Sequence, residues 1–145
     1  MWLDRFDDRL KSWSDLRIFI EPLSLEEQLN TIAKWWGHAP RVNNSVHWND
    51  KSNWPTPWEL LVDNSYCELA IALGMSYTII MIENKNCSVE IAQAKDDLGN
   101  EYNLVLVDDR KYILNYDPWS TVSKEKFKFK IANFMDARTL EGRIG

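Results

Sequence analysis

The sequence predicts an α+β fold, with N-terminal helices packed on an antiparallel sheet of about five strands. Three observations support this prediction. Up to residue 37, apolar residues recur every three or four positions, which is typical of amphipathic helices. Beyond residue 75, they form β-branched runs and alternating patterns separated by turn residues, which is typical of strands. The helical and strand-like regions follow one another along the chain, and this order favours α+β over α/β.

The composition is that of a globular domain. A chain of 145 residues with 45% hydrophobic and 27% charged residues can form one domain with its own core. The net charge of −5 disfavours nucleic acid as a partner, because phosphate binding rewards Lys and Arg. No apolar run approaches the roughly 18 residues that a membrane span requires. With two cysteines and a charged N-terminus, we expect a cytoplasmic protein.

Two helices are expected in the N-terminal region. The periodic apolar residues of 2–20 predict the first helix. Ser24 and Glu27 form a capping-box pattern at the start of the second helix, and Gly37 marks its end. Residues 38–55 are rich in Asn, Ser and Pro, which indicates a loop.

A third helix start surrounds the first cysteine. Thr56 and Glu59 form another capping-box pattern, with a proline at the first helical position. The helix either breaks at residues 63–65, where Asp, Asn and Ser favour caps and turns, or runs unbroken to Gly74. A break would place Cys67 in the first turn of a new helix, where the helix dipole acts on it.

The C-terminal region is expected to form the sheet. The pattern of residues 126–131 puts Phe127, Phe129 and Ile131 on one face, which suits an edge strand. Residues beyond 133 have no strong period. The expected strands are residues 77–82, 89–94, 102–107, 111–116 and 126–131.

The expected single domain, residues 1–145, therefore has four parts. They are a helical, Trp-rich region (1–52), a Cys-containing helix segment (53–74), an antiparallel sheet (75–131) and a tail (132–145).

Tryptophan is unusually frequent, and seven of the eight residues lie in the first 58 positions. Trp side chains bury much area and are enriched where proteins bind one another. Several of them could fill the space between helices and sheet, or form a docking surface for another protein. Stacking on a sugar is a third interpretation. The residues expected at a partner surface are Trp35, Trp36, Trp48 and Trp54.

The segment WPTPWELLVDNSYCELA resembles the nucleophile region of bacterial transglutaminase-like cysteine peptidases. In that family, a W-x-T-P-x-E-L run precedes a short break and then a Cys followed by an acidic residue and Ala. The resemblance covers roughly residues 53–118 and implies a papain-like α+β fold, with Cys67 as the nucleophile. Asp117 falls where the family has an Asp that orients its catalytic His. The matching residues are Trp54, Thr56, Pro57, Glu59, Leu60, Cys67, Glu68 and Ala70.

The chain departs from the family pattern at the catalytic base. Tyr102 or Asn103 occupies the position where the family has His. Neither side chain activates a thiol near neutral pH, as an imidazole does. The two histidines of the chain, His38 and His47, lie upstream of Cys67, and one of them could fold over it, since triads are defined by geometry.

Two functional hypotheses follow. The first is a transglutaminase-like module that has lost the catalytic His and acts through protein–protein contacts in a larger assembly. The chain is similar in size and general character to small proteins of tailed phages. By this analogy the assembly could be a tailed-phage virion, and the protein would then lie in the host cytoplasm or the virion. The alternative is a cysteine hydrolase or amidase with Cys67 as nucleophile, His47 or His38 as base and Asp117 orienting it. Neither hypothesis requires a cofactor, and the sequence indicates no metal site.

Overall fold

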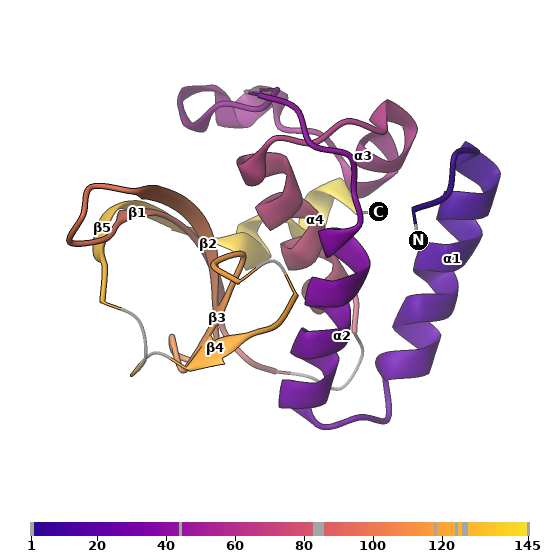
Figure 1. Ribbon diagram of the computed structural model, residues 1–145. Coiled ribbons are helices and arrows are strands. Elements are labelled where there is room, and N and C mark those ends of the chain that lie inside the picture. Colours follow the sequence, from indigo (N-terminus) through magenta and orange to yellow (C-terminus); the bar gives the residue numbers. More distant parts are fainter. Residues whose placement is uncertain are drawn as a thin grey trace.

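The computed structural model describes residues 2–43, 45–82, 86–117, 119–123, 125 and 128–144. In these residues the α-helices precede the sheet along the chain, and they lie to one side of it (Figure 1). The helices are α1 (Phe6–Ile20), α2 (Leu25–Gly37), α3 (Pro57–Asp63) and α4 (Glu68–Ile80), with the 3-10 helices η1 (Trp48–Asn53) and η3 (Ala137–Arg143). The strands are β1 (Val89–Lys95), β2 (Glu101–Val107), β3 (Tyr112–Leu114), β4 (Val122–Ser123) and β5 (Lys130–Asp136).

The sheet is antiparallel and has five strands in the order β4-β3-β2-β1-β5. β1 and β2 form a hairpin in which Val89 pairs with Val107 and Lys95 pairs with Glu101. β5 returns from the C-terminal part of the chain to pair with the free side of β1. The predicted α+β class, with helices on a five-stranded antiparallel sheet, is confirmed.

α4 is the central helix of the molecule. It packs against β1 and β2 on one side and against α2, α3 and η3 on the others, so every residue from 69 to 79 is buried. The prediction of a strand at residues 77–82 was wrong, because a helix buried on all sides has the same continuous apolar pattern as a buried strand. Among the described residues, no helix is both long and apolar enough to cross a membrane.

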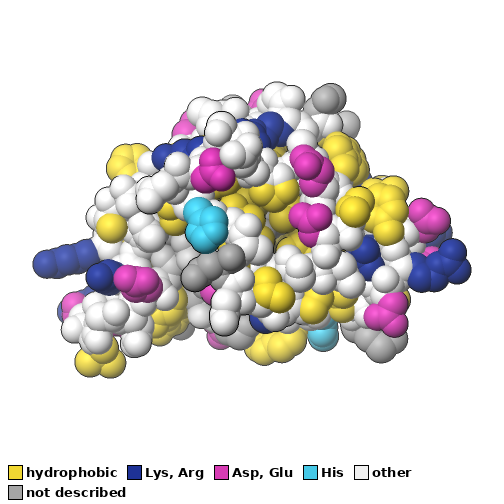
Figure 2. Space-filling view, turned by 90° about the horizontal axis from the view of Figure 1, so that it is seen from above, with side chains coloured by type: hydrophobic (Ala, Val, Ile, Leu, Met, Phe, Trp, Pro, Cys, Tyr) yellow, Lys and Arg dark blue, Asp and Glu magenta, His cyan; other side chains and the backbone are white. Residues whose placement is uncertain are grey.

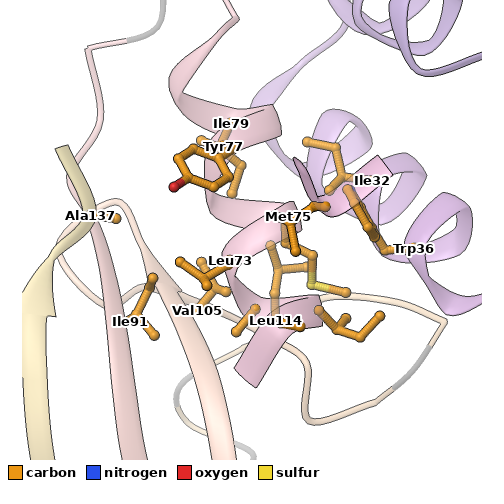
Figure 3. Packing of buried hydrophobic residues seen from close by; sticks show 14 of the residues in the cluster. Ile32, Trp36, Leu73, Met75, Tyr77, Ile79, Ile91, Val105, Leu114 and Ala137 are labelled. Carbon is orange, nitrogen blue, oxygen red and sulfur yellow. The ribbon is translucent and has the colours of Figure 1, made fainter. Parts of the chain in front are cut away.

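Two indole side chains fix α2 and α1 to α4. The Nε1–H groups of Trp13 and Trp36 both donate to the hydroxyl oxygen of Thr78, over 2.9 and 3.0 Å. The Thr78 hydroxyl donates in turn to the carbonyl of Gly74, over 2.7 Å. Figure 3 shows Trp36 and Ile32 of α2 directed towards α4. The three buried polar groups therefore satisfy one another inside an apolar core.

The sequence suggested that Gly74 ends the helix, but α4 continues beyond it. A Cβ atom at this position would lie 2.4 Å from the Trp36 ring, so the glycine lets α2 approach α4 closely. The absence of a side chain serves packing here, and the helix continues for another turn and a half to Ile80.

Of the two alternatives that the sequence left open around Cys67, the structure shows the break. α3 starts with the capping box of Thr56 and Glu59 and ends at Asp63. Asn64 then adopts a left-handed conformation with φ of 51°, which terminates α3. A new helix, α4, begins after Cys67, which is its N-cap residue.

The C-terminal region differs from the prediction. The last strand was predicted at residues 126–131, but β5 spans Lys130–Asp136. Residues 126 and 127 lie outside the described residues. Phe129 and Ile131 pack on the side of the sheet opposite the helices, against a small cluster that includes Leu104. The predicted tail contributes part of β5 and the whole of η3, whose Leu140 is buried against the core.

We predict that Gly74→Ala lowers the free energy of unfolding by about 1–3 kcal/mol, because the added methyl group would overlap the Trp36 ring. Gly142→Ala is the matched control, because no atom lies within 4 Å of the added Cβ. Urea unfolding followed by tryptophan fluorescence measures both changes. Equal stability of the two variants would contradict the role given to Gly74.

Candidate functional site

Cys67 lies at the point where the loop of residues 38–55 meets the start of α4. Its backbone N–H donates to the Ser45 hydroxyl oxygen over 3.4 Å. Its thiol donates to the Val46 carbonyl oxygen, with 3.8 Å between Sγ and the oxygen. The side chain is buried, with 6% of its surface exposed. The cysteine is therefore held by the loop on one side and by the helix on the other.

The surroundings of Cys67 favour its thiolate form. Burial raises the pKa of the thiol, but hydrogen bonds from the Ser45 hydroxyl and from the backbone N–H groups of Ala70, Ser45 and Val46 outweigh it. The net effect lowers the pKa below its ordinary value. N–H groups at a helix N-terminus are expected to stabilise a negative charge in this way.

Cys67 lines a cavity of about 490 Å³ together with His47, Trp48 and Asn103. Alternation along β2 explains why Asn103 is in this position. Asn103 and Val105 share the face of the strand that packs towards the helices, whereas Tyr102 and Leu104 face the opposite side. Of the two residues that the sequence placed at the position of the family His, the structure therefore places Asn103 in the cavity that Cys67 lines.

Asn103 is held in place by two neighbours. The indole N–H of Trp48 donates to its Oδ1 over 2.7 Å. The Nδ2 of Asn115, a buried residue directly after β3, donates to the Asn103 carbonyl over 2.8 Å and to the Glu68 carbonyl over 3.0 Å. Asn115 has a φ of 66°, a left-handed conformation that asparagine tolerates better than most residues. Asn115 thus connects β3 with β2 and with the start of α4.

The sequence did not single out Asn115. It pointed to Asp117, because the family pattern has an Asp near this strand end. Asp117 accepts the backbone N–H of Trp119 over 2.9 Å, as a turn former does. Asp117 is not among the residues that line the Cys67 cavity. The signal that could have identified Asn115 is its place one residue after the last apolar position of the strand.

The two histidines lie in different places. His47 lines the Cys67 cavity, but in the described part of the chain no hydrogen bond joins its ring to Cys67. His38 caps α2, and its ring lies edge-on to Trp119 with 5.1 Å between centroids. His38 is not among the residues that line the Cys67 cavity. Of the predicted catalytic residues, the structure therefore brings together Cys67 and His47 only.

The predicted partner-binding tryptophans divide into two pairs. Trp36 is 1% exposed and Trp54 is 2% exposed, so neither forms part of an exposed docking surface. This corrects the expectation for these two residues, which instead fill the core. Trp35 and Trp48 are partly exposed and remain candidates for contact with another protein.

Comparisons with known proteins identify the fold. No family model matches the sequence, and the comparison with curated proteins gives no match either. The solved structures of Legionella pneumophila LapG are similar. The calcium-bound form aligns with a TM-score of 0.74 at 13% sequence identity, over 94% of this chain and 78% of that one. The fold is transglutaminase-like.

Two further LapG structures agree. One has a TM-score of 0.73 at 13% identity and covers 94% of this chain and 78% of that one. The EGTA-treated form has a TM-score of 0.59 at 15% identity, over 98% and 87% of the two chains. The calcium belongs to LapG. In the described part of this chain, no three His, Cys, Asp or Glu side chains are grouped so that they could hold a metal ion.

We predict that Ser45→Ala raises the pKa of the Cys67 thiol, because the variant loses a hydroxyl that hydrogen-bonds the thiolate. The rate of iodoacetamide labelling against pH measures this pKa in a Cys87→Ser background, which leaves one thiol. The labelling curve should move to higher pH in Ser45→Ala. Ser52→Ala, at an exposed position in η1, is the control and should leave the curve in place.

Proposed function

We propose that this chain is a non-catalytic transglutaminase-like module that works through protein–protein contacts. The observation that supports the proposal is that β2 places Asn103 in the wall of the cavity that Cys67 lines, while among the described residues no hydrogen bond joins an imidazole to Cys67. The cleft is retained, and so is the cysteine at the helix start. The group that would move a proton is replaced.

The chemistry of the asparagine side chain supports a binding role. An amide does not gain or lose a proton near neutral pH, so Asn103 cannot act as a general base or later protonate a leaving amine. Its Oδ1 is already occupied by the Trp48 indole. Asn115 donates from its Nδ2 to two backbone carbonyls, whereas a residue that orients an imidazole accepts a hydrogen bond from the ring N–H. Asn103 and Asn115 therefore act as structural hydrogen-bonding residues.

The surface around the cleft supplies the contact area. Trp35 and Trp48 are partly exposed beside the apolar core, and amphipathic rings of this kind are enriched at interfaces. A role as a component of a larger assembly follows from this surface, and a tailed-phage virion is one such assembly by analogy.

A second candidate function is a cysteine hydrolase or amidase. It is favoured by the lowered pKa of Cys67 and by His47, which lines the same cavity. In this reaction the Cys67 thiolate would attack a carbonyl carbon, and His47 would protonate the leaving amine. Water would then hydrolyse the thioester and restore the thiol.

Labelling of Cys67 by iodoacetamide at pH 6 separates the two functions. In a Cys87→Ser background, we predict that His47→Ala and His38→Ala label as slowly as the parent. Asn103→His should label about tenfold faster, as expected for a drop of one pKa unit when an imidazole stabilises the thiolate. Asn100→His, in the exposed β1–β2 turn, is the control for adding a histidine elsewhere.

A different result would favour the hydrolase. Fast labelling of the parent at pH 6 that is lost in His47→Ala would show that an imidazole already activates Cys67. That result would contradict the non-catalytic proposal.

A further inference from the structure

A second cavity, of about 340 Å³, opens beside the Cys67 cavity between η1 and α3. The two cavities share Val46 and His47 in their walls, so they lie side by side, and we refer to the two together as the depression. The deep side of the second cavity is apolar and includes Trp54 and Leu60. Figure 2 shows apolar side chains at the centre of this face, with acidic side chains and a histidine around them.

Three carboxylates line the second cavity: Asp50, Glu59 and Asp63. Glu59 accepts the backbone N–H of Thr56 over 3.1 Å, and this bond together with the Thr56 hydroxyl lowers its pKa. Asp50 accepts a hydrogen bond from the amide of Asn53 over 2.8 Å. Both contacts come from neutral groups and leave the negative charge in place.

The cations among the described residues form no ion pair with these three carboxylates. Arg143 attracts Glu59 from a distance, but its guanidinium donates to the carbonyls of Lys51, Ser52 and Trp54. The cavity therefore has a negative rim and an apolar floor.

The Cys67 cavity differs in this respect. Its two carboxylates are both paired, Glu68 with Arg41 over 3.1 Å and Glu101 with Lys95 over 3.4 Å. The carboxylates without an ion pair therefore line the second cavity, which lies beside the Cys67 cavity.

We propose that the cavity between η1 and α3 binds a Lys or Arg side chain of a protein segment that crosses the Cys67 cleft. This inference rests on the proposed binding function and names the chemistry of the partner. The methylene groups of a basic side chain suit the apolar floor, and its charged end reaches the carboxylates at the rim. The volume lies at the lower end of the range for ligand pockets, about 300–1,000 Å³, as expected for a single side chain.

The charge of the chain supports this choice of partner. A net charge of −5 repels nucleic acids and anionic lipid surfaces, and it attracts basic segments. Arginine is the better probe, because its planar guanidinium donates to two carboxylates or to both oxygens of one.

The test uses the peptide acetyl-Gly-Ala-Arg-Ala-Gly-amide and its counterpart with citrulline, which keeps the shape of arginine without the charge. Binding to the full chain is followed by NMR, through backbone amide shifts. We expect the Arg peptide to shift the amides of Asp50, Ser65 and Ala70, and to bind about tenfold more tightly than the citrulline peptide, or 1.4 kcal/mol. Asp50→Asn with Asp63→Asn should remove most of this difference.

The matched control is Asp97→Asn with Asp109→Asn. It changes the net charge by the same amount at two exposed turn positions away from the depression. Equal binding of the Arg and citrulline peptides, or equal weakening by both double variants, would overturn the inference. Shifts confined to another face of the molecule would do the same.

Mass spectrometry of the peptide after the titration separates this inference from the proposed function. Cleavage that disappears in Cys67→Ser would overturn the non-catalytic function, while selective binding of the Arg peptide would still support the cavity inference. An intact peptide that does not bind would overturn the inference and leave the non-catalytic function standing.

Discussion

The hydroxyl of Thr78 accepts two indole N–H groups in the middle of the core, and the rest of the structure depends on this arrangement. It joins Trp13 of α1 and Trp36 of α2 to α4. Gly74, one turn earlier, lets the Trp36 ring reach this hydroxyl. A buried polar group left without its partner costs about 1–3 kcal/mol, so each bond helps to select one packing of the helices.

The position of the candidate site follows from this packing. With α4 fixed between the other helices and the sheet, its N-terminus lies near β2, and Cys67 and Asn103 line the same cavity. Asn115 then links the two strands to the start of the helix. The sheet and helix therefore place a cysteine and an amide in the wall of one cavity, and the amide cannot transfer a proton.

The sequence predicted much of this arrangement, because caps and turns act locally. The N-caps at Ser24 and Thr56 depend on neighbouring residues and were predicted correctly, while the break before Cys67 was one of two alternatives that the sequence left open. The end of α4 depends on what surrounds it, and a continuous apolar run does not reveal whether a helix or a sheet covers it. Asn115 also escaped prediction, because its role lies in contacts with strands and helices distant in sequence.

The central claim is that no imidazole is coupled to Cys67. NMR titration of the His47 ring in the parent chain and in Cys67→Ala tests it most directly, because a thiolate beside an imidazole would raise the pKa of the histidine. The account predicts that the two titration curves of His47 coincide. A lower pKa of His47 in Cys67→Ala would contradict it and would establish a thiolate–imidazole pair.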